Sequence, residues 1–346
     1  MKYVAVCLMI LLFGMSVSPV TGEKTCTFSR PRLLEVGEGK PYSSIQAAIN
    51  DAEAGDWIIV YEGEYHEGIF INKDNIFLVG KDRDRVIINA TGKAYGIKVD
   101  ASRITIRGFT ITRASGDGIF IRTLSEEKQI RYIDIENCNI VKNEKNGIFI
   151  ESILPTRKPP FPYIEGIKIQ SCKITDNGED GIHASYSDIE SITLCDISDN
   201  GEDGIEIGYC TTVVIMDNRV SWNDGKGIYI YVPEEGLEYP TGVYFIERND
   251  IRGNGYEGIR LAGYIMAAFI ESNNLIGNSK EKERKQVSGS VSYRFMKCKL
   301  PPIIFLWKNY WNPYKMEIVV GGLKVPMYNK DRKRATKEYD IEVEDP

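Results

Sequence analysis

Histidine is scarce in this 346-residue chain, which has only His66 and His183. Copper sites favour several histidine and methionine ligands, so two histidines far apart argue against a copper site. An excess of basic residues is also missing, because 43 Lys and Arg face 49 Asp and Glu, a formal net charge of -6. The cations are scattered except near Lys330 to Lys337. Without a basic field to hold phosphates, we expect no nucleic-acid partner.

Long apolar runs are missing too, apart from one at the amino terminus. There Lys2 precedes an almost uncharged run from Val4 to Met15, and the small pair Thr21-Gly22 follows. The run is shorter than the roughly 20 residues that a spanning helix needs. This layout predicts a signal peptide over residues 1–22 and a secreted or cell-surface protein with no stable membrane span after cleavage, although an uncleaved signal anchor stays open.

Cysteine is sparse, and six cysteines remain after the predicted cleavage. An even number in an oxidising compartment favours disulfides. For three of these residues, the repeat in the middle of the chain argues against disulfides. The six are Cys26, Cys138, Cys172, Cys195, Cys210 and Cys298.

A repeat organises the middle of the chain. Its shortest units, 176–198 and 199–221, are each 23 residues long and follow one another without a gap. After each glycine, isoleucine alternates with other residues, which is the two-residue period of a strand and does not suit a helix. The chain is therefore predicted to be all-β, a solenoid of stacked parallel coils. The repeated Gly-Ile pairs begin at Gly96, Gly118, Gly147, Gly181, Gly204, Gly227 and Gly258.

Two columns of polar or small residues follow from this register. An asparagine four residues before most of the pairs is expected to satisfy turn amides from coil to coil, a structural role. The second column lies five residues earlier, and its cysteines are predicted to be buried thiols in preference to a disulfide or metal site. The first column is Asn143, Asn177, Asn200, Asn223, Asn254 and Asn278, and the second is Cys138, Cys172, Cys195, Asn218, Asn249 and Asn273.

Both ends of such a solenoid need covering. At the front, Ser43 or Ser44 is suited to cap a short helix from Ile45 to Ala52, before the strand Trp57 to Val60. The predicted organisation is an amino-terminal cap with this helix over 23–56, β-helix repeats over 57–280, an insertion and aromatic carboxy-terminal cap over 281–329, and a charged tail over 330–346.

The segment PYSSIQAAINDAEAGDWIIVYEGEYHEGIFINKDNIFLVGK resembles the opening of pectate-lyase-like β-helices, and the N-x-x-x-Gly-Ile coils resemble the NosD-type carbohydrate-binding and sugar-hydrolysis repeats. The aromatic segment Asn309 to Tyr314 is similar to one that follows NosD-type repeats. The resemblance implies a right-handed, single-stranded parallel β-helix of the pectate-lyase-like superfamily. Signatures of pectin methylesterases and polygalacturonases are missing, so neither mechanism is carried over.

If the isoleucines face inward, the residue between them faces outward and forms a stripe. Long insertions after this strand are expected to wall the stripe into a groove for an extended sugar, with aromatic platforms at Phe120, Phe149, Tyr229 and Tyr231 and a cation at Arg260. The main column is Lys98, Phe120, Phe149, His183, Glu206, Tyr229 and Arg260, and the residues before glycine are Asp117, Asn146, Asp180, Asp203, Lys226 and Glu257.

The candidate catalytic residues are Asp180, Asp203, Glu206 and His183. Two of the carboxyls would serve a hydrolase. A lyase would need His183 or Arg260 as base and either a cation or an arginine to neutralise a uronate carboxylate. Ca²⁺ held by Asp180 and Asp203 is the one candidate cofactor, and no metal ligand is assigned beyond it. The competing interpretation is that the acids of Gly-Glu-Asp-Gly are solvated turn residues.

Two functions stay open on these grounds. The first is a secreted or cell-surface β-helix that binds, and in one version cleaves, a polysaccharide along the stripe. The second is a non-enzymatic structural or adhesion module of the cell envelope. No diagnostic catalytic motif decides whether the protein is an enzyme.

Overall fold

The structure is a computed structural model, and the chain divides into the units Met1–Arg30 and Pro31–Pro346. It describes residues 30–153, 163–232, 241–263 and 265–278, with the backbone of four later strands. Apart from Arg30, all of these residues belong to the second unit. The predicted signal peptide, Cys26, Cys298, the charged tail and most of two long insertions lie outside the described residues.

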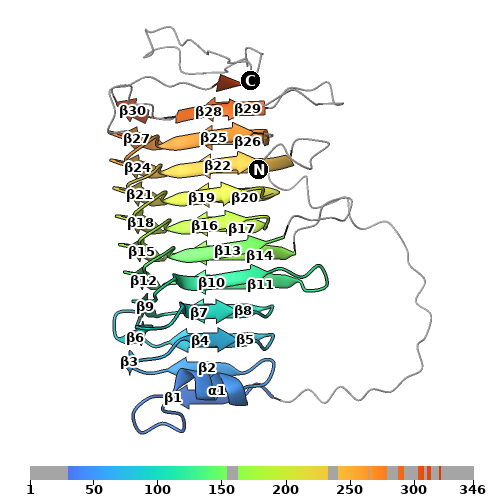
Figure 1. Ribbon diagram of the computed structural model, residues 1–346, viewed down its shortest axis with the longest axis vertical. Helices are drawn as coiled ribbons and strands as arrows, with labels where there is room; N and C mark the ends of the chain where they lie inside the picture. Colours follow the sequence, from blue (N-terminus) through green and yellow to red (C-terminus); the bar gives the residue numbers. More distant parts are fainter. Residues whose placement is uncertain are drawn as a thin grey trace, which may run out of the picture. The chain divides into compact units, whose positions relative to one another are not determined.

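The described strands form three parallel sheets, in which each strand pairs with strands of the preceding and following coils (Figure 1). The first sheet contains β1 (Leu33–Val36), β2 (Trp57–Val60), β5 (Ile76–Gly80), β8 (Ile104–Arg107), β11 (Ile130–Glu136), β14 (Ile164–Gln170), β17 (Ile189–Thr193), β20 (Thr212–Met216), β23 (Thr241–Glu247), β26 (Ile265–Glu271) and β29 (Ile303–Trp307). The second contains β4 (Ile69–Ile71), β7 (Tyr95–Val99), β10 (Asp117–Thr123), β13 (Ile148–Ser152), β16 (Ile182–Ser185), β19 (Ile205–Gly208), β22 (Ile228–Val232), β25 (Ile259–Gly263), β28 (Val287–Val291) and β31 (Val319–Val320). The third contains β3 (Gly63–Tyr65), β6 (Val86–Asn89), β9 (Thr110–Thr112), β12 (Asn139–Val141), β15 (Lys173–Thr175), β18 (Asp196–Ser198), β21 (Arg219–Ser221), β24 (Asp250–Arg252), β27 (Asn274–Ile276) and β30 (Tyr310–Asn312).

Inward isoleucines build the core that these sheets enclose. In β16 and β19, Ile182 pairs with Ile205, and both side chains are fully buried. The same register continues to Ile228 in β22. Because parallel strands buried against a core favour β-branched residues, this stacking confirms the predicted all-β parallel solenoid and the inward direction of the isoleucines.

The asparagine column is a buried hydrogen-bonded ladder, as predicted. The Nδ2 atom of Asn177 donates to Oδ1 of Asn200 over 3.0 Å, and Asn200 in turn donates to Asn223 over 2.9 Å. The backbone amide of Asn177 also donates to Oδ1 of Asn200. Each rung thus satisfies buried polar groups that a turn would otherwise leave without partners.

The cysteine column is also buried, and its thiols are free. Cys138, Cys172 and Cys195 have reduced, buried side chains, as has Cys210 outside the column. Where the column changes from cysteine to asparagine, the backbone N–H of Cys195 donates to Oδ1 of Asn218 over 2.9 Å. The prediction of stacked buried thiols is confirmed for the described cysteines.

Helix α1 (Ile45–Asp51) lies against the first coil and close to the predicted bounds. The Ser44 hydroxyl accepts from the amide of Ala47 as N-cap, and Ile45, Ala48 and Ile49 are buried. Figure 1 shows the helix beside β1 and β2 at one end of the stack. Stacking begins earlier than residue 57, because β1 already pairs with β2 inside the predicted cap.

Stacking also continues past the predicted end of the repeats at residue 280. The backbone of β28 pairs with β25, that of β29 with β26, and that of β30 with β27. Part of the segment expected to be an insertion and aromatic cap therefore supplies strands to all three sheets. The charged run beginning at Lys280 interrupts the Gly-Ile pattern, and this interruption concealed the later strands.

Candidate functional site

The predicted outward stripe exists, and its residues occupy one register position across the second sheet. Phe120 pairs with Phe149, which pairs with His183. His183 pairs with Glu206, and Glu206 with Tyr229. Arg260 pairs with Tyr229 on the following strand. Residues far apart in sequence therefore form a continuous line across strands β10 to β25.

One half of the stripe is aromatic. The imidazole of His183 stacks on the ring of Phe149, with centroids 5.1 Å apart and planes 8° apart. Phe120 stacks between Tyr95 and Phe149, with centroids 4.2 and 5.4 Å away, and is only 8% exposed. Because Phe120 is buried and Phe149 is partly exposed, Phe120 supports the platform and Phe149 lies nearer the ligand-accessible surface.

The other half combines aromatic rings with cations. The Nζ atom of Lys226 lies 4.2 Å from the Tyr229 ring centroid, and the Arg260 guanidinium lies 5.7 Å from it. Tyr231 lies beside Tyr229, with ring centroids 5.2 Å apart, and its ring lies over Gly208. A Cβ atom at Gly208 would be 2.4 Å from Cζ of Tyr231. Glycine at this position makes room for the ring.

A ladder of polar side chains lies behind the stripe, just before each glycine. The backbone amide of Asn146 donates to Oδ1 of Asp117, and that of Asp180 donates to Oδ1 of Asn146. The amide of Asp203 donates to Oδ1 of Asp180 over 2.8 Å. Asp180 is 2% and Asp203 5% exposed. The interpretation of these two aspartates as solvated turn residues is therefore wrong, because they bind amides of the next coil.

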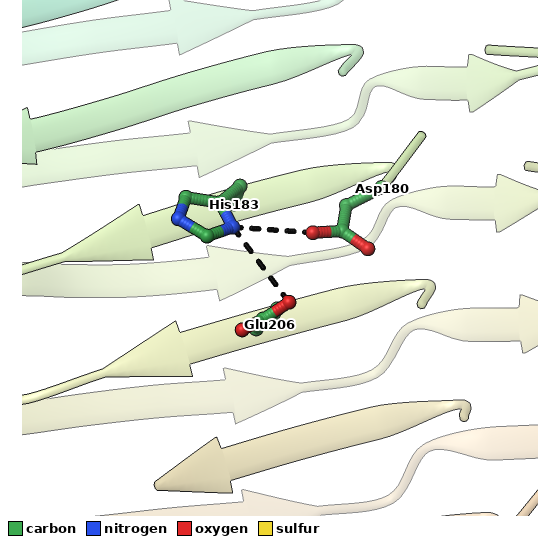
Figure 2. Close-up of side chains that lie close together, drawn as sticks. All are labelled: Asp180, His183 and Glu206. Atoms are coloured by element: carbon green, nitrogen blue, oxygen red, sulfur yellow. Dashed lines mark hydrogen bonds and ion pairs between the residues drawn. The ribbon is translucent and has the colours of Figure 1, made fainter. Parts of the chain in front are cut away.

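Asp180, His183 and Glu206 meet at the centre of the stripe (Figure 2). The Nδ1 atom of His183 lies 3.2 Å from Oδ2 of Asp180 and 3.7 Å from Oε2 of Glu206. The side chains of His183 and Glu206 are 21% and 20% exposed. Within the described part of the chain, the contacts of His183 with Asp180 and Glu206 both use Nδ1.

Burial and mutual contacts set the charges of this cluster. Burial raises the pKa of Asp180 to about 7. Burial alone would lower the pKa of His183, but hydrogen bonds and charge from Asp180 and Glu206 raise it to about 10. Burial opposes ionisation of Glu206, yet its hydrogen bond with His183 lowers the pKa of this carboxyl. At neutral pH His183 therefore holds a proton, which suits a donor better than the general base expected for a lyase.

Asp203 does not join this cluster in the way that the hydrolase scheme requires. Its Oδ1 accepts from the backbone amide of Lys226 over 2.6 Å, and its Oδ2 lies 3.2 Å from Nζ of Lys226. Both oxygens are thus engaged by one lysine. Of the four predicted catalytic residues, His183 and Glu206 reach the stripe surface, and Asp180 and Asp203 lie behind it.

Three contacts of the site were not predicted from sequence, although Asn146 and Lys226 were placed beside the stripe. Tyr95 stacks on Phe120, Asn146 holds the amide of Asp180, and Lys226 binds Asp203. All three immediately precede a glycine of the Gly-Ile pairs, so this offset was the available signal. Among the described residues, no helix has the length and apolar character needed to cross a membrane.

Comparisons with known proteins agree with this architecture. Residues 95–239 match the family model described as "Right handed beta helix region". The A-module of mannuronan C-5 epimerase AlgE6 from Azotobacter vinelandii has a TM-score of 0.58 and 16% identity, covering 80% of this chain and 82% of that chain. The Dettilon tailspike protein gp208 has a TM-score of 0.53 and 13% identity, covering 83% of this chain and 64% of that chain. The search of curated proteins found no match.

The chain is therefore a right-handed parallel β-helix. This confirms the fold implied by the resemblance of its opening segment and coils. The narrower resemblance to NosD-type repeats stays a prediction.

Proposed function

We propose that the protein binds a polysaccharide along the outward stripe of the second sheet, with His183 and Glu206 at its centre. The observation that supports this most is the register of Phe149, His183, Glu206, Tyr229 and Arg260 on consecutive strands. Aromatic rings lie at both ends of a polar centre. An extended sugar chain offers the matching sequence of apolar ring faces and hydroxyl groups.

The dimensions of the stripe suit an extended ligand. Parallel strands lie about 4.8 Å apart, so Phe149 and Tyr229, three strands apart in this sheet, are separated by roughly 14 Å along the stack. Strands β13 to β22 hold both residues within a regular sheet. A site on paired strands keeps its geometry without a ligand, which reduces the entropy lost on binding.

Paired charges beside Tyr229 favour a strongly polar sugar at that end. Lys226 and Arg260 both approach its ring. Lys226 is paired with Asp203, and Arg260, whose side chain is 42% exposed, lies 3.9 Å from Oε1 of Glu257. The fold is compatible with such a ligand, since the epimerase with the same architecture is named for mannuronan. The sequence at residues 1–22 supports the further proposal that the protein acts outside the cell or at its surface.

A glycan array followed by affinity electrophoresis tests the binding proposal. We expect the Phe149→Ala, Tyr229→Ala double variant to lose binding by at least about tenfold while its circular dichroism spectrum is unchanged, since each ring stack is worth about 0.5–1.5 kcal/mol beyond its buried area. Trp57→Ala is a matched control, because Trp57 also stacks on a neighbour, Phe77, but belongs to the first sheet. Absence of glycan binding, together with retention in the envelope, would favour the structural or adhesion module.

Cleavage of the bound glycan is a second candidate, favoured by the exposure of two proton-exchanging groups, His183 and Glu206, in front of the buried Asp180. Reducing-end and unsaturated-uronate assays on the glycans found to bind would detect it. Glu206→Gln should then abolish product while binding is retained. Product formation unaffected by this change would remove Glu206 from the mechanism.

A further inference from the structure

We infer that Asp180, His183 and Glu206 form a binding site for one divalent transition-metal ion, such as Zn²⁺ or Mn²⁺. All three ligand atoms lie within 4.8 Å of one another. They come from two adjacent coils and converge on one point (Figure 2). This inference stands apart from glycan binding, and either can fail without the other.

The donor set selects the kind of metal. One imidazole nitrogen and two carboxylate oxygens suit Zn²⁺, Mn²⁺ and related ions. Ca²⁺ and Mg²⁺ take oxygen ligands, so the nitrogen of His183 at the centre of the cluster disfavours them. The Ca²⁺ site expected between Asp180 and Asp203 fits less well, because both oxygens of Asp203 are engaged by Lys226.

The distances fit ligands around an ion. Tetrahedral coordination with bonds of about 2.0–2.1 Å places ligand atoms about 3.3–3.4 Å apart. From Nδ1 of His183 the two carboxylate oxygens lie at 3.2 and 3.7 Å, on either side of this value. A charge-assisted hydrogen bond is usually about 2.7–2.9 Å long, shorter than both distances. A bound ion would take the place of the proton between these groups.

The surroundings hold the ligands in place before any ion binds. Asp180 uses Oδ1 to accept from the amide of Asp203 over 2.8 Å, which leaves Oδ2 directed at His183. The imidazole of His183 stacks on Phe149 at an interplanar angle of 8°. Strand pairing places Glu206 directly beside His183. Outer contacts of this kind orient ligands and raise metal affinity.

The site is closed behind and open in front. Asp180 is buried, whereas His183 and Glu206 remain about one-fifth exposed toward the stripe. Two carboxylates balance the charge of a divalent ion. Three protein ligands leave at least one coordination position for water or a ligand oxygen, as in metal sites that act on substrates.

The test measures metal binding to the untagged full-length protein after chelator treatment. Equilibrium dialysis against Zn²⁺, Mn²⁺ or Ca²⁺ alone, followed by elemental analysis, should give one Zn²⁺ or Mn²⁺ per chain. Co²⁺ should give the visible absorption of a site with a nitrogen ligand. We expect His183→Gln and Glu206→Gln each to weaken binding by at least about tenfold.

Two matched controls come from the same chain. His66→Gln removes the other histidine, whose side chain is 69% exposed beside Glu64. Glu202→Gln removes one exposed carboxylate from the next turn. Both should bind the ion as the unchanged protein does. Glu206 is partly exposed and glutamine keeps its volume, so Glu206→Gln should fold, as circular dichroism will check.

Any of three results would overturn the inference. One is the absence of stoichiometric Zn²⁺ or Mn²⁺ binding by the unchanged protein. Another is binding that persists undiminished in folded Glu206→Gln or His183→Gln. Ca²⁺ bound in preference to Zn²⁺ and Mn²⁺ would equally contradict the assignment to a transition metal.

Discussion

The Nδ1 atom of His183 lies 3.2 Å from Oδ2 of Asp180 because the chain turns between them at Gly181. A Cβ atom at Gly181 would be 2.5 Å from Cγ2 of Ile197 and 2.6 Å from the carbonyl oxygen of Gly204. Glycine thus allows the turn to pack against the next coil. The same turn holds the aspartate inside and presents the histidine outside, so the stacking that stabilises the solenoid also builds the candidate site.

Asn200→Ala should destabilise the protein strongly. The change removes Oδ1, which accepts from both the amide and Nδ2 of Asn177, and it removes the donor to Asn223 and to the carbonyl of Ile174. Several buried groups then lack partners, so we expect the free energy of unfolding to fall by about 2–4 kcal/mol. Chemical denaturation measures the loss. Glu202→Ala, on the exposed turn beside it, should change little, and equal effects would contradict a ladder role.

Asp117→Asn should stabilise the protein at neutral pH. Burial raises the pKa of Asp117 above its ordinary value of 3.8, although hydrogen bonds from Asn146 oppose the shift. Between pH 3.8 and the raised value, the folded chain keeps a proton that the unfolded chain has lost. The stability from this group, full at low pH, therefore falls as pH rises through 3.8 and the raised value, and the loss persists at neutral pH. Asparagine imitates the protonated acid. The gain in melting temperature at about pH 7 should vanish near pH ~3, and a gain independent of pH would contradict this account.

The buried thiols should be inert in the folded protein. Burial raises the pKa of Cys210 to about 12 and that of Cys138 well above its ordinary value. Because all four free thiols are buried, alkylation at about pH 8 should leave Cys138, Cys172, Cys195 and Cys210 unmodified until denaturant is added. Mass spectrometry of the peptides measures the alkylation of each cysteine separately. Modification of the native protein at Cys138, or a disulfide within the column, would refute the thiol stack.

Gly208→Ala and Gly201→Ala should have different effects. At Gly208 the added Cβ meets the far end of the Tyr231 side chain, which can move, so we expect weaker glycan binding with little loss of stability. At Gly201 the Cβ would lie 2.2 Å from the carbonyl oxygen of Gly178, a backbone atom. That clash should cost about 1–3 kcal/mol of unfolding free energy. Thermal unfolding and affinity electrophoresis together distinguish the two. Equal destabilisation by both would contradict the difference in contacts.

Much of the architecture could be predicted because the repeat is nearly periodic. The 23-residue spacing that carries Asn177 to Asn200 and then to Asn223 sets the coil length, and alternation after each glycine sets which side chains face inward. These local regularities were enough to align His183 with Glu206 across strands. Where the period is interrupted after Lys280, the prediction missed strands β28 to β30.

The amino-acid sequence by itself determined the coil, the asparagine and cysteine columns and the outward stripe, because each depends on spacing along one chain. Only the tertiary structure decided that Asp180 is buried, that Lys226 engages Asp203, and that Tyr95 covers Phe120. Those contacts depend on which side chains of the preceding and following coils pack against each residue. Burial and pKa follow from such neighbours, whose distances no pattern of residue types specifies.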